Sequence, residues 1–255
     1  MNLTHKVAIV TGGTQGIGRA TALKLAAEGA SVVVVASANR QRAEIVVEEI
    51  VRAGGIGVAK VADVTKSAEL RQLVAEVGER FDRIDILVNG AGVFVPSPAG
   101  ESNEADVDRM IATNLKGTFM AIDAVVPGMK SQGSGKIVSI ASVAAFMGVG
   151  TYAIYCATKA AVFMMTRALA CELAPHGINV NAVAPGNTAT PMNEAIRTQP
   201  EYKPMLDAMA ARTPSRRTFS TPEEMAGMVA FLVSDAARAM HGSTVLMDEG
   251  FSAGL

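Results

Sequence analysis

Short apolar runs rich in β-branched residues alternate with longer segments of helical pattern along the whole sequence. Strand-like runs lie at residues 6–10, 32–35, 56–61, 84–88, 135–140, 178–183 and 244–247. Helical segments lie between them, at about 17–28, 40–53, 67–81, 103–129, 151–173 and 221–234. A helix between two strands returns the chain far enough for parallel pairing, which a tight turn cannot do. The sequence therefore predicts the α/β class, with a single-domain, doubly wound parallel sheet and helices on both faces.

Length and composition narrow the class of protein further. The chain has 255 residues with no internal repeat or linker-like tract, so we expect one domain spanning 1–255. Its formal net charge of −1 argues against a nucleic-acid-binding protein, which usually has a basic excess. Uninterrupted apolar runs are far shorter than the ~20 residues that span a bilayer, and residues 1–6 show no signal-peptide pattern. Cys156 and Cys171 fall in one expected helix and cannot form a disulfide framework, so we expect a cytoplasmic protein.

A glycine-rich turn follows the first expected strand. Its sequence is Thr11-Gly12-Gly13-Thr14-Gln15-Gly16-Ile17-Gly18, and it leads directly into the first helix. Gly12 suits a tight turn, while Gly16 and Gly18 let the backbone approach a pyrophosphate group. The helix N-terminus would add unpaired N–H groups and partial positive charge. Many glycine-rich stretches are only turns, but the position between a first strand and a first helix favours a dinucleotide phosphate site.

Tyr155 and Lys159 are one helical turn apart, so their side chains share a helix face. An ammonium group beside a phenol stabilises the phenolate and lowers a pKa that is ordinarily near ~10. A phenol tuned in this way can exchange a proton with a carbonyl or alcohol oxygen. Ser142, at the end of the fifth expected strand, can donate a hydrogen bond to the same oxygen. By itself a Tyr-x-x-x-Lys pair is more often an ordinary half-exposed helix pair, so its interpretation depends on the motifs around it.

Together these motifs resemble those of the short-chain dehydrogenase/reductase family over essentially the whole chain. They occur in the family's order: the glycine turn at 11–18, Asp63-Val64, Asn89-Gly90-Ala91-Gly92, Asn114, Ser142, Tyr155 with Lys159, and Pro185-Gly186. The layout is similar to that of 3-oxoacyl-carrier-protein reductases. The resemblance implies a Rossmann-like fold and an NAD(P)(H)-dependent oxidoreductase. Such an enzyme transfers hydride between nicotinamide C4 and the carbon of a carbonyl or secondary alcohol substrate.

The resemblance also implies roles for individual residues. Tyr155 would be the general acid/base, and Ser142 would polarise the substrate oxygen. Lys159 would bind the nicotinamide ribose and lower the pKa of Tyr155, and Asn114 would hold a water that continues the proton relay to Lys159. The other implied cofactor contacts are Gly12, Thr14, Gln15, Gly16, Ile17 and Gly18 at the turn, Asp63, Val64, Asn89, Ala91 and Gly92 on the adenine-ribose side, and Pro185, Gly186, Thr188 and Thr190 on the nicotinamide side.

Four positions depart from the usual family pattern. Gly90 replaces a second Asn, Ile140-Ala141-Ser142 replaces Ile-Ser-Ser, Thr188 replaces an aliphatic residue, and Asp248-Glu249-Gly250 replaces Asp-Gly-Gly. Ser142 alone is then in register with Tyr155, since alternation along the strand should point Ser139 elsewhere. Tyr152 has Cys156 four residues later and no base, so it is not expected to be the catalytic phenol.

The end of the second expected strand favours NADP(H) over NAD(H). An acidic residue at this place, about 20 residues after the glycines, normally binds a free ribose 2′-hydroxyl, whereas this chain has Ala36. Ser37, Asn39 and Arg40 offer donors suited to a 2′-phosphate. Gln15 argues the other way, because NADP-preferring relatives often carry a basic residue there. The alternative for Arg40 and Arg42 is a merely solvated helix start.

The substrate should lie beyond the carboxyl ends of the strands. Its expected wall comprises Val93, Phe94, Val95, Val143, Ala144, Phe146 and Met147. The long connection at 187–213 is expected to be a substrate loop or lid. Within it, an apolar underside is suggested by Met192, Met205, Leu206 and Met209, unless they only pack a short helix on the body. We therefore expect a small-molecule carbonyl compound that is apolar or bulky.

Other functions leave different traces in the sequence. An acidic carrier or a coenzyme A tail is an alternative reason for Arg197, Arg212, Arg216 and Arg217, which otherwise form a solvated face. A catalytically silent dinucleotide-binding sensor is the alternative function, but a sensor does not need Asn114, Ser142, Tyr155 and Lys159 together. An epimerase or dehydratase of the extended branch would need a further substrate domain. His5, His176 and His241 have no metal-ligand spacing, so no metal is expected.

The composition suggests that some surface is covered by other copies of the chain. Charged residues make up 18% of the chain, below the ~25% of an average soluble domain, and there are 14 methionines. The stretch 160–165 is apolar around much of its expected helix. The family resemblance implies that helices near 103–129 and 151–174 are buried between subunits. We therefore expect a homotetramer, with a dimer as the alternative.

Overall fold

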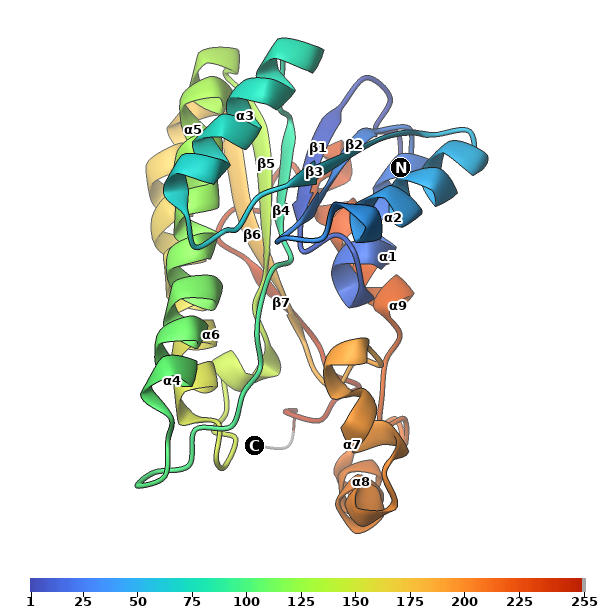
Figure 1. The fold of residues 1–255 in the computed structure, drawn as a ribbon, viewed down its shortest axis with the longest axis vertical. Helices are drawn as coiled ribbons and strands as arrows, with labels where there is room; N and C mark the ends of the chain where they lie inside the picture. Colours follow the sequence, from blue (N-terminus) through green and yellow to red (C-terminus); the bar gives the residue numbers. More distant parts are fainter. Residues whose placement is uncertain (254–255) are drawn as a thin grey trace.

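The computed structural model describes residues 1–253, in which seven parallel strands form one sheet in the order β3-β2-β1-β4-β5-β6-β7 (Figure 1). The strands are β1 (Val7–Thr11), β2 (Ser31–Ala36), β3 (Ile56–Val61), β4 (Ile86–Asn89), β5 (Gly135–Ile140), β6 (Ile178–Pro185) and β7 (Thr244–Met247). The strand order reverses between β1 and β4, and in such sheets a crevice opens at the carboxyl ends there. The predicted doubly wound parallel sheet is confirmed.

Helices cover both faces of the sheet (Figure 1). One face carries α1 (Gly16–Ala27), α2 (Arg40–Arg52) and α9 (Pro222–Leu232), and the other carries α3 (Ser67–Phe81), α5 (Thr118–Gln132) and α6 (Ala153–Leu173). Because successive strand residues point to opposite faces, Val10 and Val34 join the first apolar layer and Ile9 and Val33 join the second. Burial on both faces explains why the strands are almost continuously apolar.

The helix expected at 103–129 is not a single α-helix. It consists of α4 (Glu104–Met110), a π-helical stretch over Ile111–Gly117, and then α5. Gly117 lies close to the loop that follows β3. A Cβ at Gly117 would be 2.8 Å from Val64 Cγ2. The wide turn buries the Asn114 side chain, which is 1% exposed. π-Helical turns often occur at functional sites, and periodicity alone does not reveal them because the flanking residues keep a helical pattern.

The connection after β6 forms a separate excursion below the sheet in Figure 1, where α7 (Glu194–Thr198) and α8 (Lys203–Arg212) lie. Its two ends are held together by a parallel bridge between Thr188 and Ser220. The Ala189 N–H donates to the Ser220 carbonyl at 2.9 Å, and the Ser220 N–H donates to the Asn187 carbonyl at 2.9 Å. The excursion therefore leaves the body of the protein and returns to it at one point.

One helical segment in the described residues, Ala153–His176, is long and apolar enough by length and composition to cross a membrane. It contains α6, and 33% of its most apolar window is buried inside the protein. Core helices of soluble proteins pass the same test, and this helix packs along β6.

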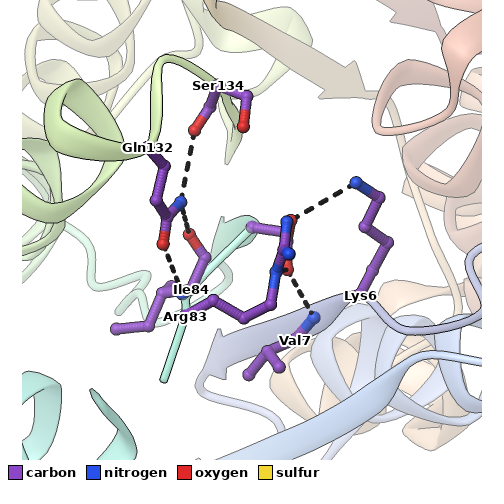
Figure 2. Close-up of polar contacts among 7 residues, drawn as sticks. Lys6, Val7, Arg83, Ile84, Gln132 and Ser134 are labelled. Atoms are coloured by element: carbon purple, nitrogen blue, oxygen red, sulfur yellow. Dashed lines mark hydrogen bonds and ion pairs between the residues drawn. The ribbon is translucent and has the colours of Figure 1, made fainter. Parts of the chain in front are cut away.

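The amino ends of the central strands meet at a buried carboxylate, far from the crevice. Asp85 is 4% exposed and accepts hydrogen bonds from the Val7 N–H at 3.0 Å and from Arg83 Nε at 2.8 Å. Lys6 Nζ lies 3.4 Å from the same carboxylate (Figure 2). Gln132, at the end of α5, pairs with both the N–H and the carbonyl of Ile84 (Figure 2). These contacts join β1, β4 and α5 where the sheet begins.

Burial alone would raise the pKa of Asp85, but the hydrogen bonds from Arg83 and Val7 and the charge of Lys6 hold it below its ordinary value. A lowered pKa in the folded state adds stability above the unfolded pKa of ~3.9, and this stability is lost as the pH falls through the folded value. We expect Asp85→Asn to lower the free energy of unfolding by about 1–3 kcal/mol at neutral pH. Urea unfolding at pH 7 and at stepwise lower pH should show the deficit narrowing below about pH 4.

The control for this prediction is Asp123→Asn, because Asp123 is exposed on α5. It should change the free energy of unfolding by less than about 0.5 kcal/mol. A deficit for Asp85→Asn that stays constant down to the lowest pH would contradict the assignment of the charge as the stabilising feature.

Candidate active site

A cleft of about 850 Å³ opens at the carboxyl ends of the central strands, next to the excursion that contains α7 and α8. Of the residues expected from the sequence, it brings together Gly12, Thr14, Gln15, Gly16, Ile17, Gly18, Ser37, Asp63, Val64, Ala91, Gly92, Ser142, Tyr155, Lys159, Pro185, Gly186, Thr188 and Thr190. The described residues that line the cleft do not include Asn39, Arg40, Asn89 or Asn114. Most of the expected constellation therefore converges on one cleft.

The glycine turn packs backbone against backbone at one end of the cleft. Gly12 has φ +63°, and a Cβ there would lie 2.7 Å from the Ala91 nitrogen. A Cβ at Gly18 would lie 2.3 Å from the Gly12 carbonyl oxygen. Helix α1 begins at Gly16, and its N-cap residue Gln15 makes no side-chain capping hydrogen bond. Since no side chain caps them, the first N–H groups of α1 can serve as donors for a phosphate.

The start of α2 differs from the sequence expectation. The Asn39 side chain accepts a hydrogen bond from the Gln41 N–H and caps α2. The Arg40 guanidinium binds Glu44 at 2.8 Å, one turn along the helix. Arg42 lines the cleft with Ser37 and donates to the Gln15 side chain. Two residues along a helix correspond to a rotation of about 200°, so Arg42 faces the glycine turn and Arg40 does not.

Tyr155 and Lys159 lie on one face of α6, as their spacing predicts. Lys159 is 6% exposed and donates a hydrogen bond to the Ile140 carbonyl at 2.6 Å. Its Nζ is 5.7 Å from the centre of the Tyr155 ring. Burial lowers the pKa of Lys159 to about 8.

The expectation of a lowered pKa for Tyr155 is wrong for this structure. Burial raises the pKa of Tyr155 to about 12, and a hydrogen bond with Ser142 only partly opposes it. The loss of hydration outweighs the stabilisation of the phenolate, because the Lys159 ammonium is bound to Ile140 rather than to the phenol oxygen. Tyr155 is therefore a protonated phenol at neutral pH, suited to donate a proton.

Asn114 lies behind the cleft lining. Its side-chain oxygen accepts from the Val93 N–H at 2.8 Å, and its amide donates to the Val93 carbonyl at 2.9 Å and to Thr158 Oγ1 at 3.3 Å. A Cβ at Gly92 would lie 3.4 Å from Asn114 Oδ1 and 3.9 Å from Lys159 Nζ. The π-helical turn thus fixes the loop after β4 against α6, beside the Lys159 ammonium.

Asn89 and Ser139 occupy paired positions in β4 and β5. Both are buried, and the Asn89 amide donates to Ser139 Oγ at 3.2 Å. Ser139 points away from the cleft, as strand alternation predicts, while Ser142 lines it. The Asn89 side chain consequently joins two strands and does not itself line the cleft.

An aromatic cluster stands next to Tyr155. The rings of Phe94 and Tyr152 are stacked, with centroids 4.2 Å apart and planes 2° from parallel. Phe94 also contacts Tyr155 edge to face, at 4.7 Å and 79°. All three rings line the cleft. The place of Tyr152 in the cleft is not predictable from the sequence, because no local pattern links it to Phe94, which lies in a different loop.

The walls of the cleft differ in part from the expected ones. Val93, Phe94, Val143 and Ala144 line it, as do Met192, Met205 and Met209 from the excursion. The described residues that line the cleft do not include Val95, Phe146, Met147 or Leu206. Phe146 instead contacts Phe163 edge to face on the outside of α6, with centroids 4.9 Å apart.

Comparisons with known proteins agree on one family. A family model described as enoyl-(acyl carrier protein) reductase matches residues 12–252. The 3-oxoacyl-acyl-carrier-protein reductase of Staphylococcus epidermidis is 40% identical over 246 residues, covering 96% of this chain and 98% of that protein. The corresponding reductase of Synechocystis sp. is 41% identical over 251 residues, covering 97% of each. A gluconate 5-dehydrogenase from Burkholderia cenocepacia, solved in complex with NADP and tartrate, has a TM-score of 0.93 and 32% identity, covering 100% of this chain and 98% of that chain.

The glycine turn leads to a prediction with a matched control. Gly18→Ala places a Cβ 2.3 Å from a backbone oxygen, so we expect a loss of about 1–3 kcal/mol of stability and weaker binding of NADP. Gly78→Ala, in α3, meets nothing within 4 Å and should leave stability equal or raise it by about 0.5–1 kcal/mol. Thermal melting and fluorescence titration with NADP measure both. Equal behaviour of the two variants would show that the tight turn is not needed.

Proposed function

Because the chain belongs to the short-chain dehydrogenase/reductase family and is an NAD(P)-dependent oxidoreductase, we propose that it interconverts a small-molecule carbonyl compound and its secondary alcohol with Tyr155 as the acid/base. The observation that carries this proposal is the convergence of Ser142, Tyr155 and Lys159 on one cleft with the glycine turn. The bound nicotinamide would supply or accept the hydride. No comparison supports the alternative of a catalytically silent sensor.

The side chains around the Tyr155 phenol have different roles in proton transfer. In carbonyl reduction the protonated Tyr155 donates its proton to the substrate oxygen, and in alcohol oxidation the Tyr155 phenolate accepts the proton of the alcohol. The Ser142 hydroxyl donates a hydrogen bond to the same oxygen, which develops negative charge in reduction. The Lys159 ammonium favours the phenolate left behind. We place Asn114 next in the proton path as a positioning residue, because it holds the loop beside Lys159.

The cofactor contacts follow the lining of the cleft. We propose that the glycine turn and the N-terminus of α1 bind the pyrophosphate. We assign Asp63, Val64, Asn89, Ala91 and Gly92 to the adenine-ribose side, with Asn89 contributing backbone. Pro185, Gly186, Thr188 and Thr190 would bind the nicotinamide side, together with Lys159 and Tyr155 at the ribose.

Replacing the phenol tests the catalytic assignment. Tyr155→Phe removes the transferable proton and keeps the ring, so we expect kcat to fall by about 10²–10⁴-fold. The Kd for NADPH, measured by fluorescence titration, should stay within about twofold, since the ring is retained. Full activity of Tyr155→Phe in a carbonyl reduction assay would refute the assignment.

We further propose that the enzyme prefers NADP(H) to NAD(H). The second strand ends at Ala36, so no carboxylate there repels a 2′-phosphate. Ser37 and Arg42 line the adjacent cleft, and a guanidinium is the cation best suited to a phosphate. Asn39 and Arg40, the sequence-based candidates, are engaged within α2. We therefore assign the 2′-phosphate contacts to Ser37 and Arg42.

Two arginine variants separate these assignments. Arg42→Ala should raise KM for NADPH about tenfold and leave KM for NADH nearly unchanged, since a charge-assisted hydrogen bond contributes ~1.5–3 kcal/mol. Arg40→Ala is the control and should change neither. A wild-type enzyme with higher kcat/KM for NADH would refute the NADP preference, and a larger effect of Arg40→Ala would return the role to Arg40.

We propose that residues 1–255 act as one domain with a lid at about 187–213, and as a homotetramer in the cytoplasm. The paired ends of the excursion support the lid. The unpaired thiols of Cys156 and Cys171 are typical of a reducing compartment. Large apolar side chains on the outer surface of the helical face support subunit contacts: Ile111, Phe119 and Met164 are 42%, 43% and 55% exposed.

A charge in this face tests the oligomer. Met164→Glu puts a carboxylate where two α6 helices would meet, so we expect the mass from light scattering to fall to a dimer or monomer. Glu172→Gln, at an exposed position of the same helix, is the control and should keep the wild-type mass. A monomeric wild type would refute the tetramer.

A further inference from the structure

We propose that the substrate is an uncharged carbonyl compound with a flat apolar ring beside the reacting carbonyl, and that the stacked pair Phe94–Tyr152 orients this ring. The inference rests on the proposed function, since it places the ring next to Tyr155. It names a substrate class that the motifs do not specify.

Few charged side chains line the cleft, which bears on the charge of the substrate. Among the described residues that line the cleft, the charged side chains are Arg42, Asp63 and Lys159. In the proposed function Arg42 and Asp63 belong to the adenine-ribose end of the cleft, and Lys159 donates to the Ile140 carbonyl at 2.6 Å and faces the nicotinamide ribose. A buried carboxylate ligand requires a cationic or multiple-donor partner. The substrate half of the cleft therefore disfavours a sugar acid.

The arginines of the excursion do not supply that partner. Arg197 donates to Asn193 Oδ1 and to the Thr190 carbonyl. Arg212 lies over the Phe251 ring, at 5.2 Å. Arg217 binds Glu224 through two hydrogen bonds of 2.8 Å. None of these three arginines is among the described residues that line the cleft.

The stacked rings of Phe94 and Tyr152 give the cleft a flat aromatic surface. Phe94 lies in the loop after β4 and Tyr152 is the N-cap residue of α6, and their rings are nearly parallel with centroids 4.2 Å apart. Because Phe94 also contacts the Tyr155 ring edge to face, a flat group lying against the pair is placed beside the acid/base. Aromatic groups favour offset-stacked or edge-to-face contact with such rings. An open-chain ketone has no flat face to match this surface.

The excursion supplies the opposite wall. Met192 and Met205 line the cleft yet remain 48% and 43% exposed. The alternative that these methionines only pack a helix on the body is not supported by such exposure. Tyr202, at the start of α8, also lines the cleft, and burial together with nearby Tyr202 raises the pKa of Tyr152. Thioethers make favourable contacts with rings, so closure over an aromatic substrate would cover this apolar surface.

The test compares two methyl ketones with the same number of carbons, acetophenone and 2-octanone, and adds gluconate in the oxidation direction. The quantity measured is the ratio of kcat/KM for acetophenone to kcat/KM for 2-octanone with NADPH. Phe94→Leu and Tyr152→Leu keep an apolar side chain and remove one ring of the pair. Each should lower the ratio about three- to tenfold, mainly through KM for acetophenone.

Two further variants serve as controls. Tyr152→Phe retains the ring and should keep the ratio within about twofold of wild type. Phe146→Leu alters an aromatic pair outside the cleft and should not change the ratio. Circular dichroism and thermal melting confirm that each variant is folded, and the two Leu variants test the pair independently.

The possible outcomes distinguish failure of the ring-binding inference from failure of the proposed function. An unchanged ratio in both Leu variants, or gluconate oxidised with higher kcat/KM than 1-phenylethanol, would overturn the ring-binding inference and leave the proposed function intact. Turnover of other carbonyl compounds but not of acetophenone would likewise overturn only the ring-binding inference. No turnover across a broad panel of carbonyl compounds and secondary alcohols, by an enzyme that binds NADPH, would instead refute the proposed function.

Discussion

The candidate site depends on the close backbone contact between the glycine turn after β1 and the loop after β4. A Cβ at Gly12 would lie 2.7 Å from the Ala91 nitrogen, so a larger residue would force the two loops apart. From Ala91 the loop continues to Val93, which Asn114 holds by two hydrogen bonds. Asn114 in turn contacts Thr158, one residue before Lys159. The proposed phosphate end and the proposed proton-transfer end of the cleft are thus joined through a few short contacts.

The amino ends of the strands, at the end of the sheet opposite the cleft, are held by charged contacts. Asp85, Arg83 and Lys6 fix the amino ends of β1 and β4, while the carboxyl ends carry the cleft. The site itself contains the buried Lys159 ammonium and the half-buried Tyr155 phenol, and loss of hydration shifts their pKa values in opposite senses.

Local patterns were sufficient for the elements and for the catalytic spacing. The strand expected at 56–61 is β3, and the helix expected at 67–81 is α3, because period and end signals are properties of neighbouring residues. Tyr155 and Lys159 share a face because helix geometry alone imposes it. The π-helical turn was missed, since it depends on Asn114 reaching Val93 in another loop. The local sequence does not distinguish Arg42 from Arg40, because only the rotation of α2 relative to the glycine turn places Arg42 and not Arg40 beside Gln15.

The amino-acid sequence by itself determined the fold class and the order of the strands and helices along the chain, which follow from periodicity and from the signals at the ends of the elements. The candidate site residues came from motifs read together through the family resemblance. Only the tertiary structure decided which cation faces the cleft, that burial raises rather than lowers the pKa of Tyr155, and that Phe94 and Tyr152 stack. The physical reason is that hydration, hydrogen-bond competition and ring contact depend on distances between segments remote in sequence, which no local pattern encodes.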